Sequence, residues 1–222
     1  MGFRLEYRTS AMEMEQFRRT YQDRERFLAC CRECPRYETR WSCPPLSFDV
    51  DDFLTTYAWV NLLCARIFLD DETIRAADTA EKMQTTGWEI VSRVKLDLED
   101  RLRALEARVP GSLSLSSGGC HRCGRCAREE GRPCRQPEKM RYSLDAFGFD
   151  LTAITQDLFQ IEILWCREHL PEYFTLIHGL LAAAPVPEEI WEAAGLGRGG
   201  KRGVTDGAFP ENKRGGRRLT PA

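Results

Sequence analysis

Histidine is scarce in this chain of 222 residues, which contains three: His121, His169 and His178. No serine or cysteine stands in a nucleophile-elbow sequence near them, so a hydrolytic triad has no support. The chain also lacks a GxGxxG motif after a strand and has no GxxxxGK[ST] loop. Because these glycine-rich loops cradle phosphates in the common nucleotide-binding folds, the sequence gives no reason to expect a nucleotide-binding enzyme.

Long apolar runs are missing as well. No stretch approaches the roughly 18 apolar residues that cross a bilayer, and the first residues, MGFRLEYRTS, do not resemble an export signal. We therefore expect no membrane partner and a cytoplasmic location. The 32 basic residues nearly balance the 34 acidic ones, a balance that argues neither for nor against a nucleic-acid partner. The five tryptophans are dispersed, which suits core packing better than base stacking, so such a partner is not expected.

The apolar residues present, 42% of the chain, are enough for a sizeable core. Residues 58–69 (AWVNLLCARIFL) read as a buried strand, and strands are also expected at 112–117 and 173–182. The strongest helical pattern lies within residues 72–109, where apolar residues step by three or four: Val91, Val94, Leu98, Leu102, Leu105 and Val109. The pattern predicts a single α/β (α+β) domain over residues 1–196, with a small sheet packed against the helix 88–109.

Weaker patterns complete this outline. A helix is expected over 11–29, a proline-containing loop over 30–45, and a short helix from a Ser47 cap to about Tyr57. A turn and a helix are expected near 143–158. Residues 197–222 combine seven glycines and seven basic residues with few large apolar side chains, which predicts a disordered tail.

Cysteine is abundant, with ten residues. Because the cytosol keeps thiols reduced, metal ligation or redox chemistry explains this number better than disulfides. The sharpest motif is Cys120-x2-Cys123-x2-Cys126, followed by Cys134. Three thiolates at this spacing suit an iron–sulfur cubane better than a zinc site built from two CxxC knuckles, although zinc remains the alternative. Whether Cys134 binds the same centre is open at this point.

A second cysteine group lies in the loop near the N-terminal end: Cys30, Cys31, Cys34 and Cys43. Cys31-x2-Cys34 has knuckle spacing, but Cys30-x3-Cys34 offers another pairing, and the pattern does not choose between them. The two groups form either one shared site or two sites, and we expect the two segments to meet in space. Cys64 and Cys166 stand in apolar runs and are expected to be small buried hydrophobic residues.

With these motifs, the chain resembles the DUF2284 family of predicted metal-binding proteins. The resemblance rests on two patterns: Cys31, Cys34, Pro35, Tyr37, Trp41, Ser42, Cys43, Pro44 and Pro45; and the stretch from Gly118 to Asp150, which contains the second cysteine group. It covers roughly residues 25–185 and implies a bound metal, most simply an iron–sulfur centre. It implies no particular reaction.

Metal ligands are therefore expected among the following cysteines: Cys31, Cys34, Cys43, Cys120, Cys123, Cys126 and Cys134. The leading hypothesis is one or two [4Fe-4S] clusters with a redox or electron-transfer role, serving a partner protein. A cluster-dependent enzyme with an open iron site and a zinc-stabilised interaction module are the alternatives. Beyond the cysteines, Arg141 is expected to pair with a carboxylate or an anion, and structural packing behind the cysteine loop is its favoured role. Ser143 and Asp150 are expected to cap helices, with Gly148 ending the first.

Overall fold

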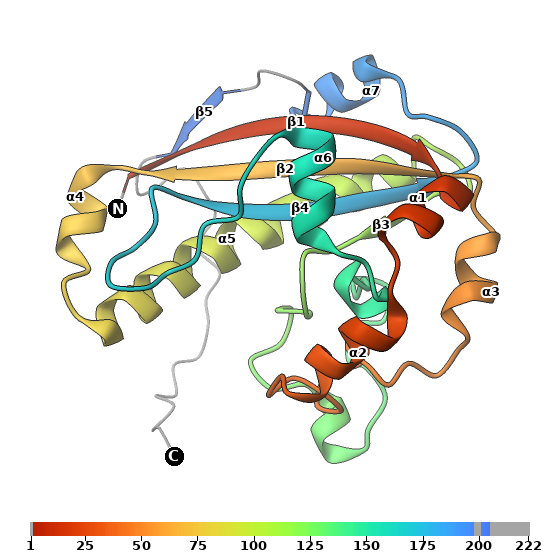
Figure 1. Ribbon diagram of the computed structural model, residues 1–222, viewed down its shortest axis with the longest axis horizontal. Coiled ribbons are helices and arrows are strands. Elements are labelled where there is room, and N and C mark those ends of the chain that lie inside the picture. Colours follow the sequence, from red (N-terminus) through yellow and green to blue (C-terminus); the bar gives the residue numbers. More distant parts are fainter. Residues whose placement is uncertain (1, 198–200, 205–222) are drawn as a thin grey trace.

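The computed structural model describes residues 2–197 and 201–204. Its centre is an antiparallel sheet in which the strands of the described residues are ordered β3-β4-β2-β1-β5 (Figure 1). The strands are β1 (Phe3–Glu13), β2 (Trp59–Leu69), β3 (Leu113–Leu115), β4 (Tyr173–Ala182) and β5 (Lys201–Val204). The helices are α1 (Met14–Tyr21), α2 (Arg24–Arg32), α3 (Val50–Thr55), α4 (Asp71–Ala76), α5 (Ala80–Glu106), α6 (Leu151–Phe159) and α7 (Glu188–Ala193), with two 3-10 turns, η1 (Ala127–Glu130) and η2 (Asp145–Phe147).

Strand β2 lies in the middle of the sheet and contributes to an apolar core on each face. Leu63 and Ile67 belong to the core on one side, whereas Leu62 and Cys64 belong to the core on the other. Successive side chains of a strand point to opposite faces, so a strand covered on both sides must be apolar at nearly every position. The strands expected near 58–69, 112–117 and 173–182 are thereby confirmed.

Helix α5 covers one face of the sheet. Its residues Val94, Leu98 and Leu102 are fully buried in the core beneath β1, β2 and β4. The expected fold class, a small sheet packed against a long helix, is therefore correct. The helical segment is divided, however: α4 ends at Ala76, and the Thr79 hydroxyl accepts a hydrogen bond from Lys82 N at 3.2 Å to begin α5.

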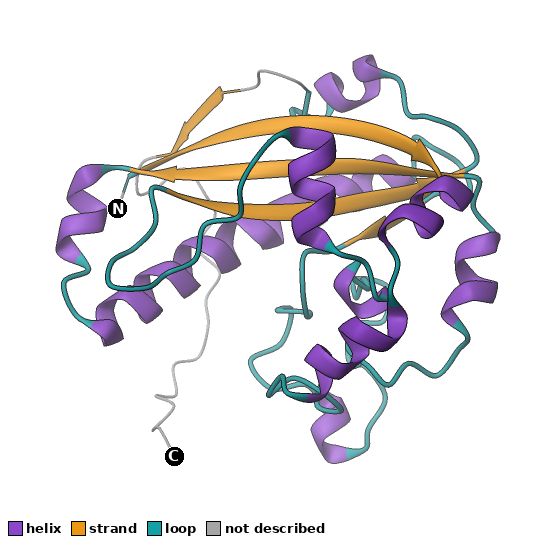
Figure 2. Ribbon diagram, viewed as in Figure 1, coloured by secondary structure: helices purple, strands orange, loops and turns teal. Residues whose placement is uncertain are grey.

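The opposite face is covered by α1, α3 and α6, so helices lie on both sides of the sheet (Figure 2). The helix expected over 11–29 is wrong in its first part, because residues 3–13 form β1. Phe3, Leu5 and Tyr7 alternate with polar residues there, which is a strand period, and all three are buried. The helical remainder is broken between α1 and α2, and Asp49 rather than Ser47 caps α3.

Helix α2 and the two cysteine loops lie away from the sheet, on the side of α6 and β3 (Figure 1). We call residues 24–48 and 117–140 the cysteine lobe. No residue of α2 is buried, so little apolar packing holds it. At the start of the lobe, Asp23 N donates a hydrogen bond to Gly148 O at 2.8 Å. The backbone of Gly148, which has φ of 82°, lies close to Arg24.

The expected disordered tail falls mostly on residues 198–200 and 205–222, which lie outside the described residues. Within it, Lys201–Val204 pair with Phe3–Glu6 of β1 as an edge strand, where the sequence predicted no regular structure. Among the helices of the described ranges, none combines the length and the apolar composition needed to cross a membrane.

Candidate metal centre

The N-terminal cysteine group sits at the end of α2 and in the tight turns that follow it. Asp23 caps α2 by accepting a hydrogen bond from Arg26 N at 3.0 Å, and the last turn carries Cys30 and Cys31. The amide of Cys34 then donates to Cys31 O at 3.0 Å, which turns the chain directly after the helix. Cys30 and Cys34 are exposed, whereas Cys31 is half-buried.

Neighbouring thiols of this group affect one another's pKa. Burial raises the pKa of the Cys31 thiol to about 11, with further contributions from Asp145 and from the thiols of Cys43, Cys34 and Cys30. Burial likewise raises the pKa of Cys43. A thiol with a raised pKa keeps its proton at neutral pH, so metal binding here must displace protons.

The second group, Cys120, Cys123, Cys126 and Cys134, lines one common cavity of about 20 Å³. Cys134 reaches the other three because the chain reverses after Cys126: η1 ends at Gly131, which has φ of 64°, and Arg132 N donates to Ala127 O at 3.0 Å. A positive φ is readily adopted by glycine, so Gly131 permits this reversal. Cys134 and the triplet therefore line the same cavity, as a shared centre would require.

Hydrogen-bond donors approach two of these sulfur atoms. Arg122 N lies 3.5 Å from Cys120 Sγ, and Gln136 Nε2 lies 3.5 Å from Cys123 Sγ. Such donors stabilise thiolates, whether they bind iron or zinc. The donor set of this cavity is therefore chemically suited to a thiolate-bound metal.

The two cysteine segments meet, as the sequence analysis expected. Cys120 N donates to Ser42 Oγ at 2.8 Å, and Arg40 Nη1 donates to Cys120 O at 2.9 Å. The lack of a side chain at Gly119 allows this approach, because a Cβ there would lie 3.1 Å from Cys43 Sγ. The segment of residues 40–43 therefore contacts the backbone of Cys120, the first cysteine of the second group.

Arg128 joins the same segments from the other side. Its guanidinium donates to the carbonyl oxygens of Arg40 at 2.8 Å, Cys43 at 2.7 Å and Pro45 at 2.8 Å. It also lies over the ring of Trp41, whose Nε1 donates to Arg132 O at 3.0 Å. One planar cation with several fixed donors can organise three carbonyls at once, which lysine cannot do.

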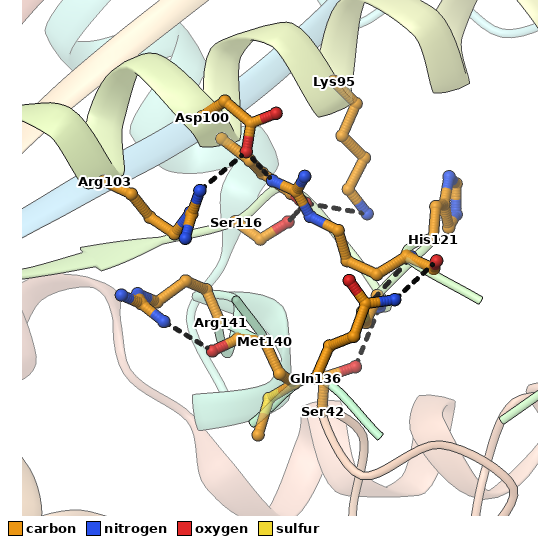
Figure 3. A network of polar contacts seen from close by, with 12 residues as sticks. Ser42, Lys95, Asp100, Arg103, Ser116, His121, Gln136, Met140 and Arg141 are labelled. Atoms are coloured by element: carbon orange, nitrogen blue, oxygen red, sulfur yellow. Dashed lines mark hydrogen bonds and ion pairs between the residues drawn. The ribbon is translucent and has the colours of Figure 1, made fainter. Parts of the chain in front are cut away.

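A polar stripe along α5 supports the second segment from behind. Four residues at helical spacing on α5 form hydrogen bonds or ion pairs with residues 114–141. Ser92 contacts His121, and Lys95 contacts Gly118 and Gly119. Glu99 contacts Ser116 and Arg122, and Glu106 contacts Ser114 and Arg141. Figure 3 shows part of this network: Lys95 and Asp100 extend from α5, and Ser116 and His121 belong to the segment that follows β3.

Lys95 and Glu99 are the buried charged pair of this stripe, with side-chain exposures of 1% and 3%. Their charged groups lie 3.8 Å apart, and Glu99 also pairs with Arg122 at 3.0 Å. Burial lowers the pKa of Lys95 to about 8, although Glu99 opposes this effect. These residues were not expected to support the site from the sequence; the signal that could have found them is the helical spacing of Ser92, Lys95, Glu99 and Glu106 beside the apolar stripe.

The remaining expectations have mixed outcomes. Arg141 pairs with a carboxylate, because its Nε and Nη2 donate to the two oxygens of Glu106 at 2.7 and 2.6 Å. Gly148 ends η2 and Asp150 caps α6 by accepting from Ala153 N, as expected. Ser143 caps no helix: η2 begins after Leu144, and Ser143 instead forms a β-bridge with Ser116.

The cysteines outside the two groups also differ from each other. Cys64 is buried in β2, and burial raises its pKa to about 12, which agrees with a hydrophobic role. Cys166 is exposed, so the expectation that it is buried is wrong. Residues 160–165 form no helix or strand in the structure, and the apolar run is therefore not part of an element.

No group of three or more His, Cys, Asp or Glu side chains within residues 2–197 and 201–204 is already arranged to hold a metal ion. The four thiols thus share a cavity without forming a complete coordination sphere.

A family model described as "Predicted metal-binding protein (DUF2284)" matches residues 18–181 of the chain. The chain belongs to the DUF2284 family. It is accordingly assigned to a family of predicted metal-binding proteins, and the matched region includes both cysteine groups. No curated protein and no solved structure matches the chain.

Proposed function

We propose that this DUF2284 protein binds a [4Fe-4S] cluster through Cys120, Cys123, Cys126 and Cys134 and transfers electrons to a partner protein in the cytoplasm. The observation that carries the proposal is that these four thiols line one cavity. Soft thiolate ligands select iron–sulfur clusters or zinc over oxygen-loving cations, and the CxxCxxC spacing suits a cubane.

The surroundings of the cavity agree with this chemistry. Four cysteine thiolates around a cluster carry net negative charge, and Arg40, Arg122 and Arg135 are among the residues that line the cavity. Lys95 lies just behind, bonded to Gly118 and Gly119. Fixed cations and N–H donors near the sulfur atoms stabilise the reduced form, so they favour a cluster that accepts an electron.

A fourth protein ligand favours electron transfer over an enzyme with an open iron site. Lewis-acid catalysis by a cluster requires one iron without a protein ligand, and Cys134 lines the same cavity as the triplet. Cys31, Cys34 and Cys43, with Cys30 beside them, form the second proposed ligand set. The contacts of residues 40 and 42 with Cys120 support the proposal of a second metal near the first.

One observation supports zinc as a second candidate. The cavity of about 20 Å³ has room for roughly one water-sized body. A single ion enters such a space with small side-chain movements, whereas a cubane requires the loop to move outward. In that case the protein is a zinc-stabilised interaction module.

Anaerobic purification followed by iron, sulfide and zinc analysis distinguishes these functions. We expect iron and sulfide in equal amounts, visible charge-transfer absorbance, and an electron paramagnetic resonance signal on reduction. The triple variant Cys120→Ser, Cys123→Ser, Cys126→Ser should lose the absorbance, because serine is a poor ligand for cluster iron. Cys166→Ser is the matched control and should retain it. Full iron and sulfide in the triple variant, or stoichiometric zinc in the native protein, would contradict the proposal.

A further inference from the structure

A larger pocket adjoins the thiol cavity and shares Trp41, Cys134 and Met140 with it. It has a volume of about 610 Å³ and lies between residues 41–47 and 128–142. Its wall includes Trp41, Leu46, Arg128, Pro133, Met140 and Tyr142. This volume is in the range of small-molecule sites, which are mostly apolar with a few polar groups. The proposed ligation of a cluster by Cys134 does not use the rest of this pocket.

The two aromatic walls are fixed by contacts outside the pocket. Trp41 is held by the hydrogen bond from its Nε1 to Arg132 O at 3.0 Å. The Tyr142 ring packs against Phe48, at 5.1 Å between centroids, and against Phe147, at 5.7 Å. Aromatic rings that are already held in place lose little conformational freedom when a ligand binds, and they favour flat ligands that pack against their faces.

The pocket contains a fixed cation, Arg128, on its wall. Arg128 is the charged residue among those that line it, and its bonds to three carbonyls use three of its five N–H groups. The remaining donors can serve a ligand. An anionic group is therefore favoured over a cationic one.

We infer that this pocket binds a small planar aromatic anion, of the size of a one- or two-ring carboxylate, in contact with the residue Cys134. The walls supply aromatic and apolar contact, and Arg128 supplies the charge. The inference goes beyond the proposed cluster and does not depend on which metal Cys134 binds, because the other lining residues named here are not proposed ligands.

The test is calorimetric titration of the purified full-length protein, with its native metal, against 2-naphthoate. Two matched probes separate the contributions: 2-naphthalenemethanol keeps the rings without the charge, and cyclohexanecarboxylate keeps the charge without the aromatic ring. We expect one saturable site for 2-naphthoate and binding weaker by about tenfold for each control, equivalent to about 1.4 kcal/mol.

A variant locates the site. Ser47 is exposed and lines the pocket, so Ser47→Trp adds bulk at the pocket without burying a new residue in the core. We expect it to weaken 2-naphthoate binding by about tenfold or more, whereas Trp165→Leu, at an exposed position outside the pocket, should leave binding unchanged.

Three results would overturn the inference: no saturable binding of 2-naphthoate, equal binding of cyclohexanecarboxylate, or unchanged binding in Ser47→Trp. Iron, sulfide and zinc are measured on the same samples. Failure of the cluster assignment is therefore read from the metal content, and failure of the pocket is read from the titration.

Discussion

The sheet of this protein is enclosed by apolar layers on both faces, whereas the cysteine lobe is joined largely by hydrogen bonds to backbone carbonyls. Leu63, Leu98 and Phe17 represent the first kind of packing, all fully buried. In the lobe, α2 buries no residue, and Arg128 alone ties three carbonyls. A lobe with so little apolar burial depends on polar ties and, in our proposal, on metal ligation.

The largest expected effect at neutral pH separates the sheet from the lobe. Leu98→Ala removes a fully buried side chain from the core between α5 and the sheet. We expect the free energy of unfolding to fall by about 3 kcal/mol, because transfer and cavity costs add. The measurement is chemical denaturation followed by circular dichroism, with metal content determined in the folded variant. A variant that keeps its stability but loses its metal would break the comparison.

Arg128→Lys tests the polar ties of the lobe. Lysine keeps the charge but cannot reach three carbonyls in one plane, so we expect a loss of about 2 kcal/mol, felt mainly in the lobe. Limited proteolysis should show faster cleavage within residues 24–48 and 117–140. Arg125→Lys is the matched control, because that side chain is 65% exposed. Equal cleavage of both variants would show that Arg128 does not organise the lobe.

His178 lies in β4, where the sheet faces the buried charge of Lys95. Burial, aided by that charge, lowers the pKa of His178 to about 3. The folded state therefore binds fewer protons than the unfolded state, whose histidine titrates near 6.5, and stability falls as the pH drops below that value.

In the wild type this loss should amount to about 1.4 kcal/mol per pH unit between about 6.5 and 3. His178→Leu should remove this contribution, so the difference in unfolding free energy between the two proteins should change with pH by that slope. Denaturation at several pH values measures it. Parallel stability curves for the two proteins would show that His178 is not held neutral.

The smallest effect on stability is expected at Gly119. In Gly119→Ala, the new Cβ would lie 3.1 Å from Cys43 Sγ and 3.3 Å from Arg36, so both neighbours must shift slightly. We expect a loss of about 1 kcal/mol and a several-fold faster release of metal to a chelator. Gly124→Ala is the control, since a Cβ there meets no atom within 4 Å. Equal release rates would argue against close contact of the two segments.

Sequence patterns predicted the elements that are either continuously apolar or follow one period. Strands β2 and β4 and helix α5 belong to this class, and the apolar stripe of α5 faces the sheet as expected. Strand β1 was missed although Phe3, Leu5 and Tyr7 alternate with polar residues: no element was expected over residues 3–10, and the helix expected over 11–29 overlaps the last three residues of the strand. Its strand identity is secured by pairing with β2 from Phe3↔Leu69 to Glu13↔Trp59.

The amino-acid sequence by itself determined the two cysteine groups and their spacing, because ligand spacing is a local property. Only the tertiary structure determined which distant residues the two cysteine groups contact. The bond between Ser42 and Cys120 joins residues 78 positions apart. The pairing of Lys95 with Glu99 is local, but the burial of Lys95 against Gly119 depends on residues 118–119 folding back against α5. Such contacts depend on which surfaces the whole fold brings together, and no short pattern encodes that.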